Sequence, residues 1–201
     1  MERKTNDSEF KQLLEKMKEH HMPLPVNRIQ IQIPDARNVL AAYFQYFLEM
    51  RGENFQWLPE YEHLADWLAD NKGRGLCLSG DCGRGKSLFL QYILPAIMLK
   101  FTGKIIRVVN SIDLAKQDED FYKKKIFCID EVGAEEIDID FGRRRDWFAR
   151  IADDAEKNSK LLIFTTNFDG DALRNRYDER TLERIVATTQ RVKFKGKSLR
   201  K

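Results

Sequence analysis

The sequence has little that would suit a secreted or membrane-spanning protein. Its 201 residues include only three cysteines, Cys77, Cys82 and Cys128, and none of them forms a C-x-x-C pair. We therefore expect reduced, packed thiols in a cytoplasmic protein rather than a disulfide framework. The first ten residues are polar, which argues against a signal peptide. The longest apolar stretch, residues 88–101, contains polar residues and a proline and is too short to span a bilayer.

The chain also lacks a dominant charge and a histidine cluster. The 35 lysines and arginines against 32 acidic residues give a net charge of +3, which permits contact with nucleic acid without arguing for it. His20 and His21 are adjacent on a predicted helix, so they do not share a face for a metal. At 201 residues the chain is long enough for one α/β domain plus a small appendage. With 42% hydrophobic and 33% charged residues, its composition is typical of a soluble globular protein.

What the sequence does contain is a glycine-rich stretch between an apolar run and a long apolar segment. From Gly80 the letters GDCGRGKS fit the pattern G-x-x-x-x-G-K-[ST] at every fixed position. Glycines let successive backbone N–H groups converge on an anion, and the following helix adds the positive end of its dipole. Lys86 can reach the β- and γ-phosphates, and the Ser87 hydroxyl can ligate Mg²⁺. The predicted nucleotide-binding residues are Gly80, Asp81, Cys82, Gly83, Arg84, Gly85, Lys86, Ser87 and Leu88.

A second candidate centre follows the apolar run of residues 126–129. Asp130 and Glu131 end this predicted strand together, and a buried strand end must tolerate both charges. Beside a phosphate loop the pair has a clear use. The Asp130 carboxylate would support Mg²⁺ together with Ser87, and Glu131 would orient and polarise the water that attacks the γ-phosphate. ATP and Mg²⁺ are therefore the expected ligands.

Asn167 ends the next apolar run, LLIFTTN at residues 161–167. In open α/β sheets the carboxyl ends of the strands face the crevice in which ligands bind. Asn167 could therefore hold the lytic water with Glu131. A turn at the strand end is the structural alternative, because asparagine suits turns.

Two arginines in the last predicted helical segment are candidates for a shared site. Arg180 and Arg184 are four residues apart and share a helical face. An arginine that one subunit presents to the γ-phosphate of its neighbour would stabilise the transferred charge. Glu179 and Glu183 offer the alternative of a surface helix held by ion pairs.

The remaining pattern predicts the elements around these motifs. We expect helices over residues 8–21, 36–50, 60–71, 86–100 and 140–158, and one or two helices over 171–189. We expect strands over 76–78, 105–109, 126–131, 161–167 and 190–195. Residues 26–33 fit a short strand or an extended linker. Pro95 should kink its helix or end it early. The helix over 36–50 is apolar nearly all round, so burial against the main domain and a partner-binding face both stay open.

In this order the motifs resemble those of AAA+ ATPases, and more narrowly the DnaC/DnaI/IstB-like group of helicase loaders and transposition helpers. The likeness covers about residues 60–201 and rests on GDCGRGKS, FCIDEVG, IFTTNF and YDERTLERI. In the family these segments are Walker A, Walker B, sensor 1 and the arginine-finger helix. The match implies that Arg184 is the arginine finger and Arg180 a supporting arginine. GKSLRK is similar to the family's closing strand, with Arg200 where a sensor-2-type arginine stands.

The resemblance implies a P-loop NTPase fold of the AAA+ (ASCE) type, a three-layer α/β sandwich with a central parallel sheet and a reduced or absent C-terminal lid. It implies an N-terminal helical docking region over residues 1–55 and an ATPase core over 56–201. The implied protein hydrolyses ATP, assembles with further copies of itself when ATP is bound, and loads a replicative helicase through its N-terminal helices. Single-stranded DNA stays open as a further ligand. Residues 110–125, between the second and third predicted strands, are short and lack the extra helical wedge that loaders of this family often carry there. The N-terminal region also lacks the cysteine cluster that binds zinc in some loaders.

Other functions stay open at this stage. The same ATPase could serve a transposase instead of a helicase. A P-loop kinase for a small molecule is a third hypothesis, although Asp130, Glu131 and Asn167 suit the activation of water. A DNA-binding module without catalysis is a fourth, which the basic residues of the tail support. Arg143, Arg144 and Arg145 could face an external anion, an acidic neighbour or solvent.

Overall fold

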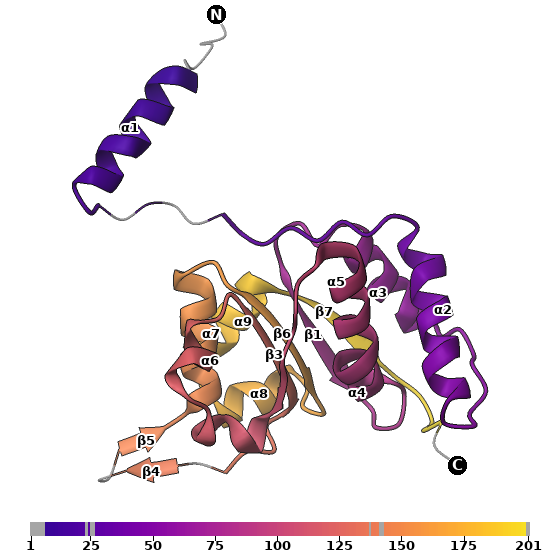
Figure 1. The fold of residues 1–201 in the computed structure, drawn as a ribbon. Coiled ribbons are helices and arrows are strands. Elements are labelled where there is room, and N and C mark those ends of the chain that lie inside the picture. Colours follow the sequence, from indigo (N-terminus) through magenta and orange to yellow (C-terminus); the bar gives the residue numbers. More distant parts are fainter. Residues whose placement is uncertain (1–6, 23, 25–26, 137, 141–142, 200–201) are drawn as a thin grey trace, which may run out of the picture.

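The computed structural model describes residues 7–22, 24, 27–136, 138–140 and 143–199. These residues form a three-layer α/β sandwich around a five-stranded parallel sheet of order β2-β3-β6-β1-β7 (Figure 1). The strands of the sheet are β1 (Gly75–Gly80), β2 (Val108–Asn110), β3 (Ile126–Val132), β6 (Leu161–Thr166) and β7 (Thr189–Phe194). The helical elements are α1 (Asp7–Glu19), α2 (Ala36–Glu49), α3 (Pro59–Ala69), α4 (Lys86–Leu88), the π-helical η1 (Phe89–Ile93), α5 (Leu94–Thr102), the 3₁₀ turn η2 (Ser111–Lys116), α6 (Glu119–Lys123), α7 (Trp147–Lys157), α8 (Gly170–Arg176) and α9 (Glu179–Thr188). The predicted α/β fold is confirmed.

The central strands are buried on both faces because their side chains alternate between two cores. In β1, Leu76 and Leu78 join the core beneath α2 to α5, whereas Cys77 joins the core beneath α6 to α9. Figure 1 shows these two groups of helices on opposite faces of the sheet. Strands buried in this way read as continuous apolar runs, which explains why periodicity located β3 and β6 well.

The edge strand β2 begins later than the sequence predicted. Val108 pairs with Cys128, so Ile105 would stand opposite Lys125, before β3 begins. Ile105 therefore finds no partner strand, and its side chain is 86% exposed. The predicted strand over 105–109 was wrong at its start, because pairing with β3 begins only at Val108, two residues after β3 itself begins.

A hairpin replaces the first turns of the helix that was predicted over 140–158. β4 (Asp138–Asp140) and β5 (Arg143–Arg145) pair antiparallel, and α7 begins only at Trp147. The Asp146 side chain accepts a hydrogen bond from the Ala149 N–H, so it caps the helix there. The three arginines thus belong to a strand, and the prediction that they lie at a helix start was wrong.

Pro95 does not end the helix after the phosphate loop, because helical structure continues through α5 to Thr102. The π-helical η1 comes directly before α5, and the Leu94 N–H bonds to the Phe89 carbonyl five residues back. This wider turn accommodates a residue that lacks an N–H and whose ring would clash with a carbonyl in a regular α-helix. This π turn lets the helix continue past Pro95.

The N-terminal part divides into a packed helix and a separate one. The ring of Phe44 on α2 stacks on Tyr61 of α3 with 4.1 Å between centroids, and Phe44 is fully buried. Ile31 and Ile33, in a segment without regular secondary structure, hydrogen-bond to the end of α3 and its following turn. Figure 1 shows α1 standing apart from the rest of the molecule. The α2 helix is thus part of the main core, while a domain boundary near residue 55 stays a prediction.

Within the described residues, no helix is long and apolar enough to cross a bilayer. The closing strand that was expected in GKSLRK is not formed at residues 196–199, because the sheet ends at β7. No helix follows β7 in the part of the chain described. Arg200 lies outside it.

Candidate nucleotide-binding site

The phosphate loop connects β1 to α4 with a backbone that only glycine tolerates at two positions. Gly80 and Gly85 have φ angles of 119° and 94°. A Cβ on Gly80 would lie 2.1 Å from the Phe194 carbonyl oxygen, and one on Gly85 would lie 2.7 Å from the Tyr61 hydroxyl. Glycine is therefore needed for both conformation and space. The predicted motif folds as the predicted strand, loop and helix.

Lys86 lies inside the curl of this loop. Its Nζ donates hydrogen bonds to the carbonyl oxygens of Gly80 and Asp81, both at 2.7 Å, and the residue is buried. An ammonium group bound to the loop's own backbone stands where phosphate oxygens would approach. This geometry suits the predicted role in phosphate binding, which stays a prediction.

The first turn of α3 holds the phosphate loop in place through contacts with Arg84. The Arg84 Nε atom lies 2.6 Å from the Glu60 Oε1 atom in a buried ion pair. The Tyr61 hydroxyl donates to the Arg84 carbonyl at 3.2 Å. The Arg84 side chain is thus engaged inside the protein, which leaves its backbone N–H for the predicted phosphate binding; that binding stays a prediction. The sequence pattern did not distinguish these two uses of Arg84.

The C-terminal tail holds the same loop from another direction. The Leu199 N–H donates to the Gly83 carbonyl at 3.0 Å, and the Gly196 N–H donates to the Asp81 carboxylate at 2.9 Å. The Arg84 Nη1 atom also donates to the carbonyl of Lys197 at 3.2 Å. The tail therefore holds the phosphate loop through these hydrogen bonds and does not form the expected strand at residues 196–199.

Asp130 lies directly beside the loop, as the two motifs predicted. Its carboxylate is 2% exposed, and its Oδ1 atom accepts hydrogen bonds from Ser87 Oγ at 3.1 Å and from Thr165 Oγ1 at 2.5 Å. Its Oδ2 atom accepts from Gln91 Nε2 at 2.6 Å. Sequence reasoning missed Thr165 and Gln91, although Gln91 lies one helical turn beyond Ser87.

These residues fit a Mg²⁺ ion that arrives with a nucleotide. A hydroxyl and a carboxylate are the oxygen ligands that Mg²⁺ prefers, and the ion usually takes its other ligands from phosphates and water. The described residues contain no group of three or more His, Cys, Asp or Glu side chains that could hold a metal. Ser87 and Asp130 therefore form half of a site that phosphate oxygens would complete.

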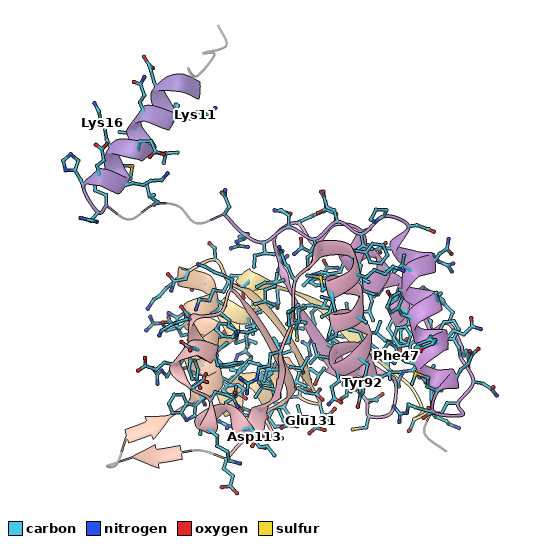
Figure 2. The ribbon with its side chains drawn as sticks, in the orientation of Figure 1. Lys11, Lys16, Phe47, Tyr92, Asp113 and Glu131 are labelled. Atoms are coloured by element: carbon cyan, nitrogen blue, oxygen red, sulfur yellow. The ribbon has the colours of Figure 1, made fainter. Side chains whose placement is uncertain are left out.

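Glu131 is brought to the same rim by an irregularity in β3. The register between β3 and β6 shifts between Ile129 and Val132, and Glu131 adopts φ of 59°, in the left-handed region. Such a conformation costs on the order of 1–3 kcal/mol and is common at functional sites. Thr165 stabilises it, because its Oγ1 atom accepts the Glu131 N–H at 2.8 Å. Figure 2 shows Glu131 at the lower rim of the sheet.

The Glu131 side chain is exposed and has one polar contact that the sequence did not suggest. Asn110, at the end of β2, donates from Nδ2 to Glu131 Oε2 at 3.0 Å. The neighbouring Ser111 hydroxyl donates to the Glu131 carbonyl at 2.7 Å. Parallel strands end at one edge of the sheet, and β2 ends at Asn110. The rule that predicted Asn167 near the site therefore also applies to Asn110.

Asn167 follows β6 directly and is exposed. Since β6 lies between β3 and β1, Asn167 occupies the same edge of the sheet as Glu131 and the phosphate loop. Within the described residues the Asn167 side chain makes no hydrogen bond, so its joint action with Glu131 on a water stays a prediction.

The two candidate arginines lie on α9, which packs against α7. Arg184 is 12% exposed and forms ion pairs with Asp153 and Glu156 of α7. A hydrogen bond from Lys157, together with the charges of Arg184 and Arg180, lowers the pKa of Asp153. Arg180, one turn earlier, is exposed. Arg184 thus forms ion pairs, as the alternative of a surface helix predicted, but its partners lie on α7 and not on its own helix.

The comparisons with known proteins concern the fold. The sequence matches no protein-family model and no curated protein. Among solved structures it is similar to DnaI, with a TM-score of 0.50 and 24% identity over 63% of this chain and 73% of that one. It is similar to the DnaC helicase loader, with a TM-score of 0.51 and 18% identity over 82% of this chain and 93% of that one.

A third similar structure is that of AMPPCP-bound DnaA from Aquifex aeolicus. It has a TM-score of 0.51 and 16% identity over 71% of this chain and 49% of that one. The chain therefore shares its fold with the DnaI, DnaC and DnaA structures, which confirms the resemblance to the DnaC/DnaI group at the level of fold.

Proposed function

We propose that this protein binds and hydrolyses ATP in the service of DNA replication. The observation that carries the proposal is the meeting of three motifs from different parts of the chain. Ser87 contacts Asp130, and the backbone of Glu131 is held by the same threonine that contacts Asp130. A merely structural glycine turn would not need two carboxylates at its side.

In the proposed reaction the loop N–H groups and Lys86 bind the β- and γ-phosphates. Ser87 and Asp130 hold Mg²⁺, which would neutralise charge on the phosphate oxygens. Glu131 accepts a hydrogen bond from the attacking water and orients it towards the γ-phosphate, and Asn167 holds the same water from β6. Asn110 fixes the Glu131 carboxylate from the far side. The reaction is in-line hydrolysis to ADP and phosphate.

We propose that the site is completed by a neighbouring copy, with Arg184 as the arginine finger and Arg180 as its support. Presenting Arg184 requires release of its ion pairs with Asp153 and Glu156. Mixing tests this shared site. Glu131→Gln and Arg184→Ala proteins should each be inactive, and their mixture should recover hydrolysis, because some interfaces then hold both native residues. A mixture that stays inactive would refute the shared site.

The proposed client is a replicative helicase, bound through the N-terminal helices. The name of the similar DnaC structure describes a helicase loader. In support, α1 stands apart and exposes Phe10, Leu13 and Leu14. Such an apolar face favours a protein partner. A transposase is the second candidate client, on the resemblance of the motifs alone, and single-stranded DNA is a further proposed ligand.

Affinity capture of the intact Glu131→Gln protein with ATP tests the client. Slow hydrolysis should hold the complex in its ATP form. Recovery of a hexameric helicase supports helicase loading, whereas recovery of a transposase supports the second candidate. The matched control is the Glu131→Gln protein in EDTA, which should retain neither.

A further inference from the structure

Gln91 contacts the metal-site carboxylate from the helix that follows the phosphate loop. It lies in η1, one helical turn after Ser87, so both side chains face Asp130. The Gln91 Nε2 atom donates to Asp130 Oδ2 at 2.6 Å. Among the described residues, Gln91 is the hydrogen-bond donor to this oxygen, since Ser87 and Thr165 both bond to Oδ1.

This division of contacts determines how firmly the carboxylate is oriented. The terminal torsion of an aspartate has a broad, shallow preference, so contacts must set the plane of its two oxygens. Two donors on Oδ1 already limit rotation about the Cβ–Cγ bond. The donor on Oδ2 restricts this rotation further, because it holds the carboxylate at its other oxygen. A carboxylate has about four lone-pair sites, so three hydrogen bonds leave room for one metal-bound water.

We propose that Gln91 is a positioning residue for the Mg²⁺ site, acting through Asp130. The inference rests on the proposed nucleotide-dependent function and names a residue that the motifs do not include. By holding Oδ2, Gln91 keeps the remaining acceptor site of Asp130 directed at the ion's water shell. Gln91 itself contacts neither the ion nor the phosphates.

The surroundings explain why loss of Gln91 should affect the metal rather than the fold. Gln91 is exposed and lines a groove of about 340 Å³ that also includes Asn110 and Asp130. Water from this groove can replace the lost donor, so Asp130 is not left unsatisfied. A water molecule, however, is not anchored by the backbone, so it holds the carboxylate less firmly than Gln91 does. Residues that orient metal ligands typically change metal affinity by about 10- to 100-fold.

The test separates metal affinity from nucleotide affinity in the full-length protein. Gln91→Met keeps the length of the side chain and removes its N–H donors. Binding of a fluorescent ADP is measured in EDTA, and binding of Mn²⁺ to the ADP complex is measured by electron paramagnetic resonance. The expected result is an unchanged ADP affinity in EDTA and a roughly tenfold weaker Mn²⁺ affinity.

The matched control is Gln45→Met on α2. Gln45 also donates its amide to a carboxylate, that of Glu49 at 2.8 Å, but on the surface. The Gln45→Met variant should change neither the ADP affinity in EDTA nor the Mn²⁺ affinity of the ADP complex. Gln91→Ala is the second variant and should repeat the split if methionine at this position perturbs the helix.

Three results would overturn the inference. Wild-type Mn²⁺ affinity in both Gln91 variants would show that Asp130 needs no third donor. An equal loss of ADP affinity in EDTA would show a structural role. A wild-type protein that binds no nucleotide would refute the proposed function, and the inference with it, whereas the first two results leave the proposed function intact.

Discussion

Replacement of Arg84 by methionine should destabilise the protein by leaving a carboxylate buried without its partner. The Arg84 and Glu60 side chains are 9% and 6% exposed, and 2.6 Å separates Nε from Oε1. Methionine retains most of the apolar stem of arginine but lacks its charge and its donors. The negative charge of the buried Glu60 carboxylate would then have no cation beside it.

The size of the effect follows from this burial. Removing one partner of a buried ion pair costs about 3–5 kcal/mol, because the other charge stays uncompensated. Loss of the hydrogen bond from Arg84 to the Lys197 carbonyl adds about 1 kcal/mol. A loss of about 4–6 kcal/mol is expected, which is a large part of the roughly 5–15 kcal/mol that stabilises most domains.

The assay is urea unfolding, followed by tryptophan fluorescence and circular dichroism. The double variant Arg84→Met/Glu60→Leu should recover most of the lost stability, because an apolar pair can replace a buried ion pair at little cost. Arg51→Met is the matched control. Arg51 pairs with Glu53 at 3.1 Å on the surface, where such a pair contributes less than about 1 kcal/mol.

Two results would refute this reasoning. If Arg84→Met were as stable as Arg51→Met, the ion pair would not matter for the fold. If the double variant were as unstable as Arg84→Met alone, the loss would arise from the altered packing of the loop and not from an uncompensated charge.

Two further predictions concern side chains at the rim of the site. Asn110→Ser retains an oxygen that can cap η2 but cannot reach Glu131, so ATP affinity should hold while the hydrolysis rate falls roughly tenfold in a phosphate-release assay. A raised rate would show instead that Asn110 restrains Glu131. Cys82 is exposed, whereas burial raises the pKa of Cys77 to about 12 and also raises that of Cys128. A thiol reagent should therefore label Cys82 alone in the folded protein, ATP should slow the reaction, and labelling of all three would contradict this burial.

The sequence predicted those parts of the site that depend on local spacing. The curl around Gly80 and Gly85 is encoded within one short segment. The meeting of Ser87 with Asp130 follows from a rule of parallel sheets, whose strands end at one edge. No knowledge of distant side chains was needed for either prediction.

The remaining contacts depend on how distant segments pack. The Arg84 side chain pairs with Glu60, which lies 24 residues away in sequence. The Arg184 side chain pairs with Glu156 of α7, which lies 28 residues away. Local spacing around either arginine does not predict such a partner. The hairpin before α7 competes with a helix of similar local propensity, so spacing alone could not decide between them. Tertiary packing sets these outcomes.

The most direct test of the central claim is phosphate release from ATP by wild type and by Glu131→Gln, with ATP binding measured alongside. The account predicts steady release by the wild-type protein in Mg²⁺. It predicts that Glu131→Gln binds ATP with similar affinity and releases phosphate about 10²–10⁴ times more slowly, the usual contribution of a positioned base. Hydrolysis by Glu131→Gln at the wild-type rate would contradict the account.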